Sequence, residues 1–348
     1  MIHKKILVYC SVVPFETPPY WLRKTAEGLA KFCPVIFIDL QSAQARSLTK
    51  YKLHLPMFLL GIYLFLSKYL LGYTIILITT TPEKNRLYSY IPYSISCFDC
   101  TDQYSMTQFS DCSVQISKFN MVFTNSELLT KLIRQITSKV KLISTGYLPN
   151  GFMTNGVLPK IGHSVIFSGG ISHRVDYDLL SKVIETLPKV QFFFMGEVYL
   201  EKYYVDKALD AACSKAWKKL LQKPNVHYLG AFTEVASRRL LPLFQVGIIP
   251  YKVKDPMNSF SHPIKLYEYL QAGLPIVSTA LPTIIVLAEK LPISISKTVP
   301  EMITAIKKSL KFKEMSKQRS SYKKIFEQQT ESRKVVQILN WLDTQYEI

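Results

Sequence analysis

Residues 258–279, NSFSHPIKLYEYLQAGLPIVST, predict a helix, a tight stop and a buried strand in direct succession. Ser261 or His262 can cap the helix, and Pro263 suits its first turn. Gly273 supplies a left-handed end, and the apolar run that follows is typical of a strand. This is the repeating unit of parallel α/β proteins, so the stretch predicts that class.

The same alternation runs outward from this stretch through the whole chain. Uninterrupted apolar runs suit strands that are covered on both faces of a parallel sheet, with helices between them. We expect strands at 6–12, 35–40, 74–79, 94–99, 121–126, 140–145, 164–169, 190–196, 226–230, 246–251 and 275–279.

The turn at Asn150-Gly151 and the Gly/Pro-bearing segment 152–163 predict a linker between two domains. The sequence therefore predicts two doubly wound, Rossmann-like α/β domains that face each other across a cleft, with a C-terminal helical tail. We expect an N-terminal domain at 1–155 and a second domain at 160–325. A C-terminal helix at 326–348 should pack back toward the N-terminal domain.

The composition limits the classes of function. With 48% hydrophobic residues the chain is not disordered, and six cysteines are too few for a disulfide scaffold, which indicates a cytoplasmic protein. Lys and Arg number 43 against 25 Asp and Glu, a net charge of +18, so an anionic partner is expected. The charge is spread over both halves, which favours a phosphorylated substrate or an anionic membrane surface over nucleic acid.

The most apolar segment, 53–80, predicts a helix near 57–70 and a strand at 74–79. Its longest uncharged stretch, Leu55–Ser67, is too short to span a bilayer, which takes about 20 residues. One interpretation is a buried helix and strand. The other is a face lying in a membrane interface, for which these side chains are suited: Tyr51, Lys52, Tyr63, Lys68, Tyr69 and Tyr73.

Lys265 and Glu268 lie early in the helix predicted at 263–272. A cation in the first turn opposes the helix dipole by about 0.3–1 kcal/mol, and a bound anion would reverse that penalty. The ammonium and the free backbone N–H groups of 264–266 could together bind a diphosphate, while Glu268 could accept hydrogen bonds from ribose hydroxyls. The alternative is an ordinary Lys–Glu pair on a solvated helix.

The run PIKLYEYLQAGLPIVST resembles the donor-site helix of GT-B-fold glycosyltransferases of the group 1, family 4-like class. FTNSELL, LPNGF, VIFSGGISHRVDYDLL and FFFMGE agree with that class in their order. SISCFDCTDQY (94–104) is similar to a stretch of bacterial cell-surface polysaccharide transferases of the exopolysaccharide and teichuronic-acid type. The resemblance spans most of residues 5–345.

The resemblance implies donor-binding residues, one by one: Gly170, Arg174, Ser261, His262, Lys265 and Glu268. Of these, Glu268 would hold the nucleotide ribose and the others would meet the diphosphate and the donor sugar. Arg174 could instead be a surface residue paired with Asp176 or Asp178. Many relatives carry a second Glu eight residues before the first. Phe260 stands there in this chain, which leaves the donor sugar open.

Asp99 and Asp102 follow the strand at 94–99 and are the candidate catalytic carboxylates, because sites form at the C-terminal ends of parallel strands. Each could equally cap the following loop. Cys97 and Cys100 form a CxxC without a second pair, and neither His173 nor His262 has a metal-ligand partner four residues on, so we expect no metal. The resemblance implies a nucleotide sugar as substrate and no cofactor.

The resemblance implies a retaining glycosyltransferase of cell-surface polysaccharide biosynthesis, with the acceptor bound by the domain at 1–155 and the donor by the domain at 160–325. The donor would be a UDP- or GDP-linked sugar, and the acceptor a glycan or a polyprenyl-diphosphate-linked oligosaccharide. The enzyme would be cytoplasmic and peripheral on the inner face of the plasma membrane. The alternatives are a catalytically inactive GT-B-like binding module and, less favoured, a nucleic-acid-binding protein.

Overall fold

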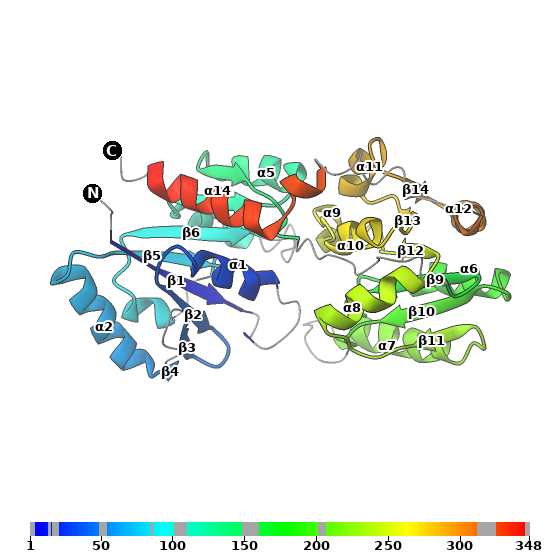
Figure 1. Ribbon diagram of the computed structural model, residues 1–348, viewed down its shortest axis with the longest axis horizontal. Coiled ribbons are helices and arrows are strands. Elements are labelled where there is room, and N and C mark those ends of the chain that lie inside the picture. The colour runs from blue at the N-terminus through cyan, green and yellow to red at the C-terminus, as the bar shows by residue number, and fades with distance from the viewer. Residues whose placement is uncertain are drawn as a thin grey trace. The chain divides into compact units, whose positions relative to one another are not determined.

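The computed structural model describes residues 4–12, 15, 21–48, 54–83, 86–100, 110–147, 160–200, 207–311 and 325–344. The chain divides into two compact units: unit 1 comprises Met1–Pro149 with Glu327–Ile348, and unit 2 comprises Asn150–Phe326. Each unit has a central sheet with helices packed on it (Figure 1). The predicted α/β class with two Rossmann-like units and a C-terminal helix is confirmed.

Unit 1 contains an eight-stranded sheet in the order β4-β3-β2-β1-β5-β6-β7-β8. Its strands are β1 (Lys5–Ser11), β2 (Val35–Asp39), β3 (Gln44–Ser47), β4 (His54–Leu55), β5 (Thr74–Thr79), β6 (Ile95–Cys100), β7 (Met121–Thr124) and β8 (Val140–Leu142). All pair in parallel except β3 and β4, which extend one edge in antiparallel register. These two strands escaped prediction because they are short and carry no apolar run.

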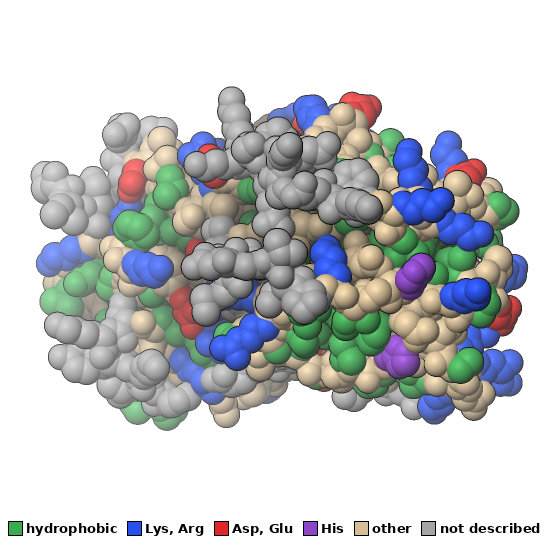
Figure 2. All heavy atoms as spheres, turned by 45° about the vertical axis from the view of Figure 1, so that its right-hand side comes forward, with side chains coloured by type: hydrophobic (Ala, Val, Ile, Leu, Met, Phe, Trp, Pro, Cys, Tyr) green, Lys and Arg blue, Asp and Glu red, His purple; other side chains and the backbone are tan. Residues whose placement is uncertain are grey.

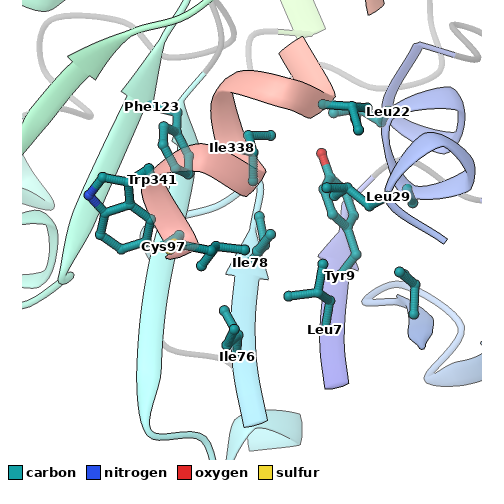
Figure 3. Close-up of a cluster of buried hydrophobic side chains, with 14 of the residues drawn as sticks. Leu7, Tyr9, Leu22, Leu29, Ile76, Ile78, Cys97, Phe123, Ile338 and Trp341 are labelled. Carbon is teal, nitrogen blue, oxygen red and sulfur yellow. The ribbon is translucent and has the colours of Figure 1, made fainter. Parts of the chain in front are cut away.

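The two faces of this sheet carry different helices. Alternate residues of β1 point to opposite faces, as strand geometry requires. Leu7 and Tyr9 join a core with α1 and α14, whereas Ile6 and Val8 join a core with α2. Figure 3 shows Ile338 and Trp341 of α14 pointing at strand residues such as Cys97. The helices are α1 (Trp21–Leu29), α2 (Met57–Tyr69), η1 (Arg86–Tyr90), α4 (Ser113–Ser117), α5 (Glu127–Arg134) and α14 (Glu331–Thr344).

The C-terminal segment belongs to unit 1, and α14 lies beside α1 (Figure 1). The Tyr147 N–H donates to the Gln329 carbonyl at 2.8 Å. The Ser144 hydroxyl donates to the Thr330 carbonyl at 2.9 Å. The C-terminal segment therefore completes the first unit's core. The segment that we predicted as a linker lies mostly outside the described residues.

Unit 2 contains a six-stranded sheet in the order β11-β10-β9-β12-β13-β14, and every pair in it is parallel. Its strands are β9 (Ser164–Ser168), β10 (Gln191–Met195), β11 (Val226–Tyr228), β12 (Val246–Ile249), β13 (Ile276–Thr279) and β14 (Ile293–Ser296). Its helices are α6 (Tyr177–Thr186), α7 (Lys207–Leu221), α8 (Glu234–Leu240), η2 (Leu241–Leu243), α9 (Pro256–Ser259), α10 (Lys265–Gln271), α11 (Pro282–Ala288) and α12 (Val299–Leu310).

This order is that of a Rossmann fold, in which the chain reverses its direction of travel across the sheet between its first and fourth strands. In unit 2 these are β9 and β12, which lie side by side. A crevice forms at the carboxyl ends of such a pair, because the connections leave in opposite directions. Ligands of doubly wound sheets bind there.

Candidate functional site

The turn that leaves β9 requires glycine at two places. Gly169 has φ +117°, and a Cβ there would lie 2.8 Å from Nζ of Lys265. A Cβ on Gly196, at the end of β10, would lie 2.0 Å from the carbonyl oxygen of Gly169. The backbone after β9 therefore approaches both the next strand and Lys265 too closely for any side chain.

Lys265 is the first residue of α10 and is only 8% exposed. Its Nζ lies 3.8 Å from the ring centre of Phe167 in β9 and 4.8 Å from that of Tyr251, just after β12. Within the part of the chain that the structure describes, this ammonium makes no hydrogen bond of normal geometry. It thus sits at the β9–β12 switch point as a buried cation held mainly by aromatic faces.

Burial lowers the pKa of Lys265 below its usual value. The Tyr251 hydroxyl and the Glu268 carboxylate raise this pKa again, while the neighbouring Arg174 lowers it. A buried charge without a full set of partners is unfavourable unless a counter-charge is supplied. The position is therefore suited to an anionic ligand.

Arg174 lies in the loop between β9 and α6. Its Nε donates to Oδ1 of Asn258 and its Nη2 to Oγ of Ser261, both at 2.7 Å. The guanidinium carbon lies 5.1 Å from the Tyr251 ring centre, so two cations lie close to one tyrosine ring. Asp176, considered as a partner from the sequence, instead caps α6 by accepting from the Leu179 N–H.

The loop before α10 is held by its own side chains. Nδ2 of the buried Asn258 donates to the carbonyls of Arg174 and Lys252. The Ser261 carbonyl accepts from the Thr283 hydroxyl, and His262 Nε2 shares a 2.6 Å hydrogen bond with the Tyr267 hydroxyl. Ser261 and His262 therefore position the loop.

The predicted capping of α10 by Ser261 or His262 is wrong. Ile264 occupies the N-cap position in a helical conformation, without a side-chain cap. The Leu266 N–H donates to the Pro263 carbonyl at 3.1 Å, so it is not free for a diphosphate as we expected. The short turn before α10 therefore engages one of the three backbone donors that we expected to face an anion.

Glu268 lies one turn into α10 and is half-buried. Its charge raises the pKa of Lys265, which places the carboxylate near the ammonium. The next residue, Tyr269, accepts the Ser168 N–H at 2.7 Å through its hydroxyl, and a Cβ on Gly247 of β12 would lie 2.4 Å from its ring. Tyr269 thus holds α10 against β9 and β12 and fixes where Lys265 and Glu268 lie.

Asp99 is buried near the end of β6, in unit 1. Its carboxylate accepts the Tyr9 hydroxyl at 2.7 Å and pairs with Lys334 Nζ at 2.8 and 3.1 Å. Both charged side chains are 3% exposed, so this ion pair joins β1, β6 and α14 inside the unit. The geometry gives Asp99 a structural role rather than that of a solvent-facing base. Asp102 lies outside the described residues.

Three sequence features carry no further chemistry in the described residues. Cys97 and Cys100 are buried free thiols, and burial raises the pKa of Cys97. Across the described ranges, no group of three or more His, Cys, Asp or Glu side chains could hold a metal ion. Basic side chains are scattered over the face in Figure 2 and do not form one strip. Sequence reasoning missed Tyr251, Asn258 and Tyr269, which are single residues of common types.

No protein-family model matches the chain. TuaH of Bacillus subtilis (strain 168), named as a teichuronic acid biosynthesis glycosyltransferase, is 30% identical over 118 residues. That match spans 34% of this chain and 26% of TuaH, about a quarter of the relative's length.

Three solved structures align over nearly the whole chain. HepE of Anabaena in complex with UDP-glucose has a TM-score of 0.64 at 14% identity, covering 98% of this chain and all of HepE. Sucrose-phosphate synthase of Thermosynechococcus elongatus has a TM-score of 0.64 at 13% identity, covering 99% and 100%. The alpha,alpha-trehalose-phosphate synthase (UDP-forming) of Burkholderia xenovorans has 0.62 at 9%, covering 98% and 99%.

The chain has the GT-B fold. At these identities the structural alignments establish the architecture of two Rossmann-like units. The match to TuaH agrees with the resemblance of the sequence to GT-B glycosyltransferases. In this fold the ligand crevice of unit 2 is expected at the β9–β12 switch point described above.

Proposed function

We propose that this GT-B protein is a glycosyltransferase of cell-surface polysaccharide synthesis. Unit 2 binds a nucleotide-diphosphate sugar, and the sugar passes to a glycan or polyprenyl-diphosphate-linked acceptor at unit 1. The named activity of TuaH and the UDP-glucose complex of HepE support this class of reaction and donor. The bound UDP of that neighbour makes UDP the first nucleotide to test, with GDP as the alternative.

The observation that carries the proposal is the buried Lys265 ammonium beside Arg174 at the β9–β12 switch point. Sugar transfer breaks the bond between the anomeric carbon and the β-phosphate oxygen, and the electron pair stays on the phosphate. Cations fixed beside that oxygen offset the charge that develops on it. Lys265 and Arg174 perform this task in the proposed site, with Gly169 and Gly170 letting the diphosphate approach the backbone.

Ser261, His262 and Glu268 complete the proposed donor site. Ser261 orients the Arg174 guanidinium, and His262 braces the start of α10 through Tyr267. Glu268 accepts hydrogen bonds from the ribose hydroxyls, which a carboxylate can do with both oxygens.

Retention at the anomeric carbon is the proposed stereochemical outcome. An inverting enzyme needs a base on the face opposite the leaving group, and the buried ion pair with Lys334 makes Asp99 unsuited to that task. When the acceptor attacks from the face that the donor phosphate leaves, the departing phosphate oxygen can take the acceptor proton. The outcome can be measured from the anomeric configuration of the product.

The function is tested with Glu268→Gln and with Glu289→Gln as its matched control, since Glu289 is exposed at the end of α11. Glu268→Gln loses the charged hydrogen bonds to the ribose, which contribute about 1.5–3 kcal/mol. Its Kd for UDP should therefore rise by about 10- to 100-fold. Its Kd for inorganic pyrophosphate, which has no ribose, stays within about twofold by the same reasoning. Calorimetry measures both ligands, and GDP is titrated in parallel. Equal UDP affinity in all three proteins would contradict the assigned site.

A second candidate function is a binding module that has lost turnover. Phe260 stands where many resembling proteins have a Glu, and Asp99 is engaged in an ion pair. Release of free sugar from the nucleotide sugar, or its transfer to an acceptor extract, by the purified chain would exclude this candidate. Binding of the nucleotide sugar without either product would support it.

A further inference from the structure

Helix α2 of unit 1 presents an apolar face that nothing in the described chain covers. Only Leu60, Leu64 and Ser67 of its 13 residues are buried. The exposed apolar side chains of the helix and its end are Phe58, Leu59, Ile62, Tyr63, Phe65, Leu66, Tyr69, Leu70 and Leu71. Phe58 is 67% exposed and Leu70 is 74% exposed, which is unusual for side chains that are normally buried.

The helix is firmly attached on its other side. Leu60 and Leu64 pack into the core beneath the sheet, and the Lys68 ammonium donates to the Pro92 carbonyl at 2.8 Å. Gly61 allows close approach to Tyr90, because a Cβ there would lie 3.3 Å from the Tyr90 carbonyl oxygen. The exposed face is therefore the outward side of a well-packed element. An exposed apolar patch of this kind marks an interaction surface.

The helix is suited to lie in a membrane surface. None of the described helices reaches the length and apolarity that crossing a bilayer requires. A helix of 13 residues is about 20 Å long at 1.5 Å per residue, against a hydrocarbon core of about 30 Å. Exposed tyrosines, Tyr63 and Tyr69 on α2 with Tyr90 and Tyr93 beside it, carry the mixed apolar and polar character of interfacial residues.

The charge around α2 indicates which kind of partner covers its exposed face. Residues 40–82 contain no Asp or Glu, and Lys68 lies in the last turn of α2. Lys4 is exposed, with its Nζ 5.6 Å from the Tyr73 ring centre, and Arg86 is exposed at the start of η1. An anionic lipid surface complements this positive rim. A second copy of the chain docked symmetrically on the same face would instead place positive charge against positive charge.

We propose that the exposed face of α2 inserts into the interface of an anionic lipid bilayer and holds the protein on the membrane. The apolar side chains enter the boundary between headgroups and acyl chains, and the basic side chains around them contact the anionic headgroups. The proposal stands on α2 alone and does not depend on which ligand unit 2 binds.

The test is co-sedimentation of the full chain with vesicles of phosphatidylglycerol and phosphatidylcholine, or of phosphatidylcholine alone. The triple variant Phe58→Gln, Ile62→Gln and Phe65→Gln removes one stripe of the face without touching a buried residue. Its control is Phe32→Gln with Val114→Gln, two side chains of the same unit that are 64% and 60% exposed. Thermal melts confirm that both variants fold.

The wild-type chain is expected to partition at least about tenfold more strongly into the anionic vesicles than into phosphatidylcholine alone. Two basic residues near the surface, at about 1 kcal/mol each, are enough for a difference of this size. The triple variant should lose about a hundredfold in partition coefficient, and the control less than about twofold. Equal binding by the triple variant and wild type overturns the proposal, as does the absence of wild-type binding to anionic vesicles. Sedimentation velocity of the same proteins tests the other occupant. A dimer that forms in the wild type and not in the triple variant would assign the face to a second copy and would also overturn the proposal.

Discussion

Lys265 and Lys334, which are both buried, should respond to the same substitution in opposite directions. Lys265 is 8% exposed and lies against aromatic rings, whereas Lys334 is 2% exposed and pairs with Asp99. Methionine matches the aliphatic part of lysine but removes the charge. The effect of Lys→Met at each site therefore reports whether the folded protein supplies a counter-charge.

The magnitudes follow from the surroundings of each ammonium. At Lys265 the lowered pKa means that burial disfavours the charged form, so removing the charge is favourable. The loss of cation–π attraction costs about 1 kcal/mol in return. With both effects included, Lys265→Met should raise the free energy of unfolding by about 1 kcal/mol. That corresponds to an increase in Tm of about 2–4 °C for a unit of this size. Lys334→Met leaves Asp99 buried without its partner and should cost about 3–5 kcal/mol.

The Lys265→Met variant should also bind UDP more weakly than the wild type. Removing one charge-assisted contact to a diphosphate costs about 1.5–3 kcal/mol, which raises the Kd for UDP about 10- to 100-fold. Because a bound anion restores the charged form of Lys265, UDP binding by the wild type should take up protons at alkaline pH, and the variant should not. Thermal melts with and without UDP, and calorimetry in buffers of different ionisation heat, measure these effects. A destabilised Lys265→Met protein with an undiminished UDP-induced shift in Tm would refute the reasoning.

Two further predictions concern the packing and the pH dependence of unit 2. Gly247→Ala should lower the free energy of unfolding by about 1–3 kcal/mol, because the new methyl would lie 2.4 Å from the Tyr269 ring. Gly162→Ala, with no atom within 4 Å, should change it by less than about 0.5 kcal/mol; similar chemical-denaturation midpoints for the two would contradict the packing. Burial lowers the pKa of His173 although Asp255 lies 3.6 Å away, so the unfolded chain binds the proton at a higher pH than the folded one. Stability should therefore fall as the pH drops below about 6.5, by at most about 1.4 kcal/mol per pH unit, and His173→Gln should flatten that slope in melts from pH 7 to 5. An unchanged slope would show that His173 is not the group responsible.

The order of strands and helices was predictable because it is written in local patterns. Apolar runs bounded by glycine and proline gave strands such as β9 and β10, and the resemblance at 263–279 located α10 with its Lys265 and Glu268. The edge strands β3 and β4 were not predictable, since QARS and HL are too short and polar for any periodicity. They form because β2 offers an unpaired edge.

The site was predictable in its residue types but not in its geometry. The sequence suggested the Lys265 ammonium and the backbone N–H groups of 264–266 as joint anion donors, and the structure brings Lys265 and Arg174 to the same tyrosine ring. Tyr251 lies about 80 residues along the chain from Arg174, so no spacing rule could place its ring beside both cations. Asp99 shows the same limit, because its partner Lys334 comes from the far end of the chain.

By itself the sequence determined that the chain alternates strand and helix, that it is strongly basic, and that one helix near residue 60 is apolar on nearly every side. Hydrophobic periodicity and glycines at helix ends are local patterns, so they can be recognised without knowledge of the fold. Only the tertiary structure decided which lysine is buried among aromatic rings, which carboxylate is engaged in an ion pair, and which face of α2 the described residues leave uncovered. Those properties depend on contacts between residues distant in sequence, and packing sets them after the local elements have formed.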